Sequence, residues 1–98
     1  MYEGCKVDLQ MQRMISADGI FDETTRYFKI KRYEANDDFM TLLAKDSDLT
    51  VLSLDAKYQC YIHTGTEKLN CSGVIRERFQ SEDGNVVIFR IENGFYSA

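Results

Sequence analysis

Residues 58–73, YQCYIHTGTEKLNCSG, contain the clearest folding signal in the chain. Apolar and polar side chains alternate on both sides of Gly65-Thr66, and this dipeptide suits a two-residue hairpin loop with Gly65 at a positive φ. With that loop, apolar residues face apolar residues and polar residues face polar residues. We therefore predict an antiparallel hairpin with the pairs Tyr58–Gly73, Cys60–Cys71, Tyr61–Asn70, Ile62–Leu69 and His63–Lys68.

This register decides how the cysteines can be used. Residues 60 and 71 would form a hydrogen-bonded pair with Cα atoms about 5.5 Å apart, which a disulfide can span. The chain has three cysteines, the third being Cys5, and such an odd, sparse set suits a reducing cytoplasm. We expect two reduced core thiols, with the disulfide as the alternative. No Cys-x-x-Cys pair is present and His63 is the single histidine, so no metal site is predicted.

A second hairpin is predicted to join residues 74–80 to residues 86–92. A two-residue loop at Asp83-Gly84 would oppose arginines to apolar residues. A three-residue loop over residues 82–84, with Gly84 in the left-handed conformation, pairs apolar residues with one another and is favoured. The favoured pairs are Phe79–Val87 and Ile75–Ile91.

This favoured register leaves one mismatch, because it sets Glu77 opposite Phe89. Gly73 lies inside the long run of residues 68–80 and predicts a bulge or corner. A bend in this strand would change the side to which Glu77 points.

The remaining chain is also mostly strand-like, with apolar residues at every second position. Further strands are predicted over residues 5–12, 26–34, 39–44 and 49–54, although the last could instead form a corner. Loops or turns are predicted over residues 15–25, 36–38 and 45–48. The expected fold is all-β, a small antiparallel barrel or sandwich of six to seven strands.

Composition limits the class of protein. The 98 residues allow one domain, residues 1–98. With 44% hydrophobic and 29% charged residues the chain is too apolar for disorder, and it has no apolar run of bilayer length. A net charge of −4 speaks against a nucleic-acid partner. No secretion signal is recognisable, which favours a cytoplasmic location.

The sequence shows no set of residues for catalysis. His63 is predicted on the wet face of its hairpin, without a nucleophile beside it. The paired acids lie in turns, where they are hydrated, whereas a general acid needs a recessed pocket. We therefore predict that the chain is not an enzyme.

Five residues are candidates for an interaction surface. Tyr27, Tyr33 and Tyr61 are expected on wet strand faces, where tyrosine offers contact area at a low entropic cost. Arg76 and Arg78 could bind a phosphate or carboxylate, or pair with acids across strands. Lysines 29 and 31 share a face with Tyr27 and Tyr33; they could contact a nucleic acid, but the acidity of the chain favours simple protection of a strand edge.

Five segments, in their order along the chain, carry a family resemblance: GCKVDL (4–9), FKI (28–30), YQCYIHT (58–64), LNCSGVIRERF (69–79) and GNVVIFRI (84–91). Together they resemble the N-terminal domain of flagellar-brake-type PilZ proteins of clostridia-like bacteria. The resemblance implies a small split β-barrel that precedes a PilZ barrel.

In that family, cyclic di-GMP is held by an Arg-x-x-x-Arg segment between the barrels and an Asp/Asn-x-Ser-x-x-Gly strand in the second. No two arginines of this chain are four positions apart, Ile75 stands where the second motif has glycine, and the proline expected near Ala44-Lys45 is absent. No ligand residue is carried over, and cyclic di-GMP is expected only with residues beyond Ala98. The implied partners are a C-terminal PilZ domain and flagellar motor proteins.

The function expected on these grounds is a non-enzymatic regulatory or interaction module. The alternative is a stand-alone acidic domain that uses its turn carboxylates to bind a basic partner.

Overall fold

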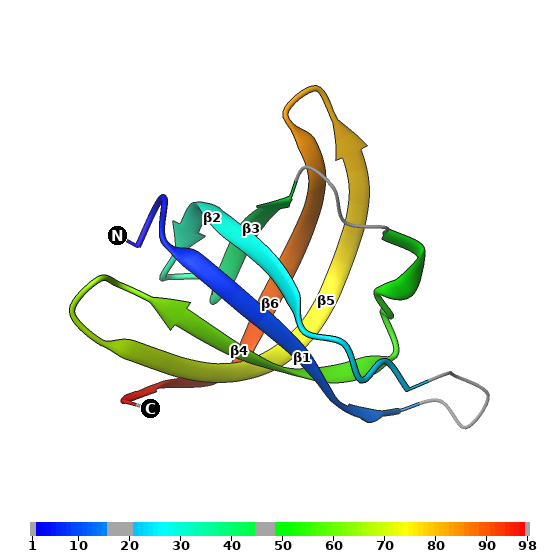
Figure 1. Cartoon of the computed structure of the whole chain (residues 1–98), viewed down its shortest axis with the longest axis horizontal. Helices are drawn as coiled ribbons and strands as arrows, with labels where there is room; N and C mark the ends of the chain where they lie inside the picture. Colours follow the sequence, from blue (N-terminus) through cyan, green and yellow to red (C-terminus); the bar gives the residue numbers. More distant parts are fainter. Residues whose placement is uncertain (1, 16–20, 45–48, 98) are drawn as a thin grey trace.

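The computed structural model describes residues 2–15, 21–44 and 49–97, and of residues 95–97 it describes the backbone only. Six antiparallel strands form a closed barrel in the ring order β1-β2-β3-β6-β5-β4 (Figure 1). A single turn of 3-10 helix, η1, precedes β4. The elements are β1 (Lys6–Met14), β2 (Arg26–Glu34), β3 (Phe39–Ala44), η1 (Leu49–Val51), β4 (Ala56–His63), β5 (Lys68–Ser81) and β6 (Gly84–Ser97). The all-β barrel predicted from the sequence is confirmed.

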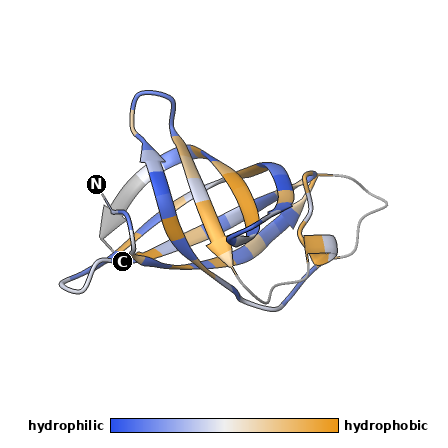
Figure 2. Ribbon diagram, turned by 90° about the horizontal axis from the view of Figure 1, so that it is seen from above, coloured by the Kyte–Doolittle hydropathy of each residue, from blue (hydrophilic) through white to orange (hydrophobic). Residues whose placement is uncertain are grey.

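The barrel interior is filled by the apolar half of each alternating strand. Val7 and Leu9 of β1 are fully buried, whereas Lys6 and Gln10 on the same strand are exposed. Figure 2 shows this exchange of apolar and polar residues along the ribbon. No polar or charged residue is classed as buried in the described part of the chain. The polar residues therefore point outward, and any recognition chemistry lies on the outer surface or at the ends of the barrel.

The hairpin of β4 and β5 has the predicted register at all five pairs. Gly65 has a φ of +94°, and the Thr64 N–H donates to the Glu67 carbonyl at 3.0 Å to close the loop. Cys60 and Cys71 lie opposite one another as buried free thiols. A hydrogen bond with Cys71 and burial together raise the pKa of the Cys60 thiol well above its ordinary value, so this thiol stays protonated and unreactive.

Both registers considered for the next hairpin were wrong. The loop consists of Glu82 and Asp83 alone, and Ser81 pairs with Gly84. The Ser81 hydroxyl accepts from the Asp83 N–H at 3.2 Å and donates to the Gly84 carbonyl at 3.1 Å, so Ser81 holds a loop one residue shorter than the favoured one. Phe79 consequently pairs with Val86 and is 45% exposed, instead of facing the core.

Register shifts in the pairing of β5 with β6 restore the packing. The register with β6 shifts between Ile75 and Glu77, so Ile75 stays buried opposite Phe89 while Glu77 is exposed. It shifts again between Ser72 and Gly73, as the glycine predicted. A Cβ atom at Gly73 would lie 1.9 Å from the Arg90 carbonyl oxygen, a distance that no side chain can adopt. Glycine is therefore required at this point, where the backbones of β5 and β6 approach so closely.

One predicted strand is absent. Residues 49–54 form η1 and a bend, because Leu52 turns inward and is 1% exposed, and so covers one end of the barrel. The Ser53 N–H donates to the hydroxyl of buried Tyr58 at 3.0 Å, which gives that hydroxyl a partner. Residues 16–20 of the first predicted loop and the predicted turn 45–48 lie outside the described residues.

Replacing Gly73 with alanine should destabilise the protein by about 2–3 kcal/mol, because the backbone of Arg90 must move to admit the new methyl group. The matched control is Gly94→Ala on β6, where an added Cβ atom has nothing within 4 Å. This control should change stability by less than about 0.5 kcal/mol. Urea unfolding of both variants measures the difference, and equal effects would contradict the close approach.

Candidate functional site

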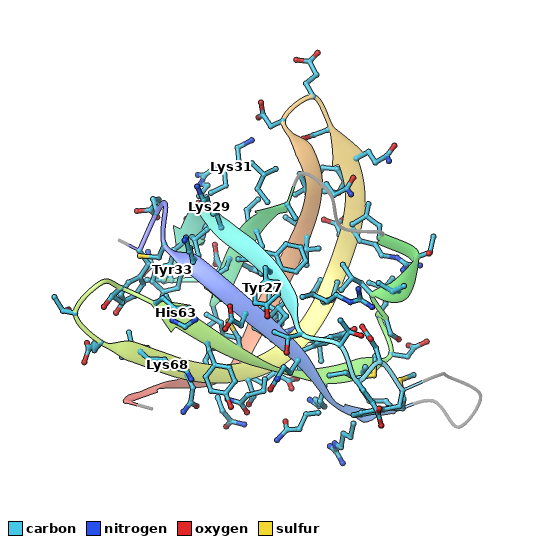
Figure 3. All side chains as sticks on the ribbon, viewed as in Figure 1. Tyr27, Lys29, Lys31, Tyr33, His63 and Lys68 are labelled. Atoms are coloured by element: carbon cyan, nitrogen blue, oxygen red, sulfur yellow. The ribbon has the colours of Figure 1, made fainter. Side chains whose placement is uncertain are left out.

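Four basic side chains form one row across the outer face of four neighbouring strands. The strand registers place Lys29 of β2 opposite Lys6 of β1, Lys6 opposite His63 of β4, and His63 opposite Lys68 of β5. All three lysines are exposed, and the His63 side chain is 40% exposed. Figure 3 labels Lys29, His63 and Lys68. We call Lys29, Lys6, His63 and Lys68 the basic row. It spans three strand spacings, about 14 Å.

A second row lies beside the first, two residues further along each strand. Tyr27 of β2 is opposite Asp8 of β1, and Asp8 is opposite Tyr61 of β4. We call Tyr27, Asp8 and Tyr61 the tyrosine row. Tyr27 is 67% exposed, the largest exposed fraction among the described large hydrophobic side chains. Two of the five predicted interaction residues therefore share one face.

Contacts between the two rows join them into one surface. His63 Nε2 lies 3.0 Å from Asp8 Oδ2, and Lys68 Nζ lies 4.5 Å from the ring centroid of Tyr61. The second contact is a cation–π interaction, which holds the ammonium group over the aromatic face. His63 and Lys68 are thus positioned by the tyrosine row. His63 lies on this outer surface, as predicted.

Tyr33 lies apart from this surface, near the end of β2. Its ring packs against Tyr2 with centroids 5.5 Å apart, and its backbone N–H donates to the Glu3 carboxylate at 3.0 Å. Burial raises the pKa of Tyr33 above its ordinary value. Tyr33 therefore anchors the N-terminal segment, and little of it is left for a partner.

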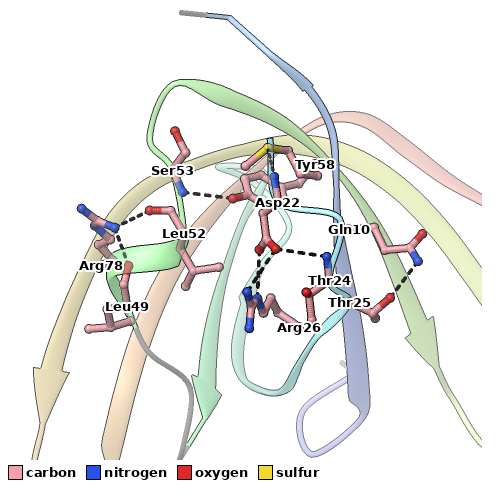
Figure 4. Close-up of polar contacts among 11 residues, drawn as sticks. Gln10, Asp22, Thr24, Thr25, Arg26, Leu49, Leu52, Ser53, Tyr58 and Arg78 are labelled. Atoms are coloured by element: carbon pink, nitrogen blue, oxygen red, sulfur yellow. Dashed lines mark hydrogen bonds and ion pairs between the residues drawn. The ribbon is translucent and has the colours of Figure 1, made fainter. Parts of the chain in front are cut away.

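The two predicted arginines lie on the far half of β5, where that strand pairs with β6. Arg76 is exposed at the bulge between Ile75 and Glu77. The Arg78 guanidinium donates to the carbonyl oxygens of Leu49 and Leu52 (Figure 4). Arg78 thus braces η1 against β5 and serves the fold, and the two arginines do not meet the tyrosines.

A cavity of about 630 Å³ opens at the end of the barrel that η1 covers. Its wall includes Asp22, Arg26 and Arg78 together with the exposed apolar side chains of Phe21 and Leu54. Asp22 accepts two hydrogen bonds from the Arg26 guanidinium, at 2.9 and 3.0 Å, and one from the Thr24 N–H at 3.0 Å (Figure 4). Asp22 and Arg26 are thus engaged with one another and Arg78 with the backbone, and His63 does not line the cavity.

Within residues 2–15, 21–44 and 49–97, no group of three or more histidine, cysteine, aspartate or glutamate side chains could hold a metal ion. The same ranges contain no helix long and apolar enough to cross a membrane. The acids of the turns before β3 and after β5 lie at opposite ends of β3, since Phe39 pairs with Arg90 and Ala44 with Asn85.

Sequence reasoning missed the basic row because it did not find Lys6. The alternation of residues 5–12 places Lys6 outward, but only the pairing of β1 with both β2 and β4 places it between Lys29 and His63. Those pairings join segments about 20 and 55 residues apart, for which no short turn supplies a signal. The one local clue was the predicted His63–Lys68 pair.

Comparison with protein-family models, with curated proteins and with solved structures finds no match to this chain. The strand order and the outer surface described above are therefore the basis for assigning a function.

Replacing Arg78 with methionine should lower the free energy of unfolding by about 1–2 kcal/mol, because two carbonyl groups lose a charged donor. Arg76→Met removes an exposed guanidinium from the same strand and should change stability by less than about 0.5 kcal/mol. Urea unfolding measures both variants. Faster amide exchange at Leu52 in the Arg78 variant alone would confirm the brace.

The Asp22–Arg26 pair should make stability depend on acid. Burial acts to raise the pKa of Asp22, but the hydrogen bonds from Arg26 and Thr24 outweigh it and hold that pKa below its ordinary value. The stabilisation is therefore present above about pH 4 and is lost as the pH falls through the lowered pKa. Asp22→Asn should cost about 1–2 kcal/mol at pH 7 and flatten this loss. Glu82→Gln, in the exposed turn after β5, should leave the pH profile of unfolding unchanged.

Proposed function

We propose that this chain is a non-enzymatic docking module that presents its outer surface to a partner, as the N-terminal barrel of a flagellar-brake-type PilZ regulator does. One observation carries the proposal. The exposed face of β2, β1, β4 and the start of β5 gathers two tyrosines and the basic row, while Cys60 and Cys71 face the interior, on the other side of the sheet from His63. Groups for binding are brought together on this face, and groups for nucleophilic catalysis are kept apart.

In this proposal the partner lies in the same polypeptide. Residue 97 pairs with Leu69, next to Lys68 at the start of β5. A PilZ domain following Ala98 would thus begin beside the basic row. In this proposal, cyclic di-GMP binds with residues beyond Ala98 and changes how the two barrels are oriented, a shift between populations of relative orientation. The module acts in the cytoplasm, and flagellar motor proteins are its further partners.

The proposal predicts that a protein of residues 1–98 does not bind cyclic di-GMP, whereas the natural protein extended beyond Ala98 does. Isothermal titration calorimetry on both proteins provides the measurement. The genomic reading frame after codon 98 is an independent check, since an arginine-rich segment followed by a second barrel is expected. Tight binding by residues 1–98, or a reading frame that stops at codon 98, would contradict the assignment.

A further inference from the structure

The basic row contains a repulsion that the fold does not relieve. Lys6 lies directly opposite Lys29, and like charges in directly opposed positions of an antiparallel pair are destabilising. Lys31 and Lys57 each have an ion-pair partner, Asp83 and Glu92. Among the residues that the structure describes, neither Lys6 nor Lys29 has one. An anion supplied from outside would remove this repulsion.

The neighbouring tyrosine row adds contact area to this charge. Tyr27 is 67% exposed and pairs with Asp8, which is itself engaged by His63. Exposed tyrosine is typical of residues that dominate protein–protein binding energy, because it buries a large rigid area. Asp8 is the one acid in the two rows, and its carboxylate is already in contact with His63, at 3.0 Å.

We propose that the face formed by β2, β1, β4 and the start of β5 binds an acidic polypeptide segment of a partner protein. Its carboxylates contact Lys29, Lys6 and Lys68, and its apolar atoms pack on Tyr27. The contacts are made by side chains, because the closed ring offers no free strand edge for a partner strand. This inference rests on the proposed docking function and adds the chemistry of the partner.

The charge distribution favours an acidic polypeptide over a nucleic acid. The chain carries 16 acidic and 12 basic residues, so a long polyanion leaving the row meets a surface of its own sign. The row is about 14 Å across and matches a few carboxylates.

Binding of a fluorescent poly-glutamate peptide to the protein, followed by anisotropy, tests the proposal. We expect binding that weakens as salt is raised, because exposed charges are screened. Lys6→Gln and Lys29→Gln should each weaken it by about threefold. The matched control, Arg90→Gln, removes one exposed charge from β6, on the far side of the ring from β1, and should leave binding unchanged.

Thermal unfolding supplies a readout that does not depend on the peptide. Lys6→Gln should unfold no earlier than the wild type, since the substitution removes the like-charge contact.

Preferential binding of oligo(dT) of equal charge would overturn the proposal in favour of a nucleic-acid surface. Salt-sensitive self-association lost in Lys6→Gln would overturn it in favour of a second copy. Absence of peptide binding, or an equal loss in Arg90→Gln, would also overturn it, and none of these results bears on cyclic di-GMP binding by the extended protein.

Discussion

The barrel depends on the close approach of two backbones at Gly73 and Arg90. Strand β5 pairs with β4 along its first half and with β6 along most of its length, so Gly73 has a paired strand on each side. Glycine permits this because it has no Cβ atom to meet the Arg90 carbonyl. On either side of β5, β4 pairs in turn with β1 and β6 pairs with β3, and the sheet closes without a free edge.

Closure also determines what the surface can present. In a closed ring every strand has one dry and one wet face, so burying Val7 and Leu9 commits Lys6 and Asp8 to the outside. The registers of β1 with β2 and with β4 then align the wet residues of three strands. The basic row and the tyrosine row are consequences of core packing. They set Lys6 opposite Lys29, although an acidic residue at either position would stabilise the sheet. An unfavourable pair of this kind is typical of a functional surface.

Local signals account for the successes and failures of sequence reasoning. Arg26–Glu34 and Phe39–Ala44 were found with correct bounds, because alternation and nearby turn residues depend on neighbours in the chain. The Ser81–Gly84 turn was missed because one serine side chain bonds to two backbone groups, which the Asp-Gly pattern does not reveal. Residues 49–54 form η1 and a bend, the corner that was the alternative to the predicted strand, because burial of Leu52 at the barrel end, braced by Arg78, outweighs local propensity.

The sequence by itself determined the fold class, the register of the β4–β5 hairpin with its paired thiols, and the need for a bulge at Gly73. These features follow from side-chain alternation and from glycine conformation, which act over a few residues. Only the tertiary structure decided that Lys6 stands between Lys29 and His63, that Arg78 is used by the fold, and that Tyr27 and Tyr61 share a face without Tyr33. Each of these depends on pairing between distant strands, which core packing selects once the ring closes.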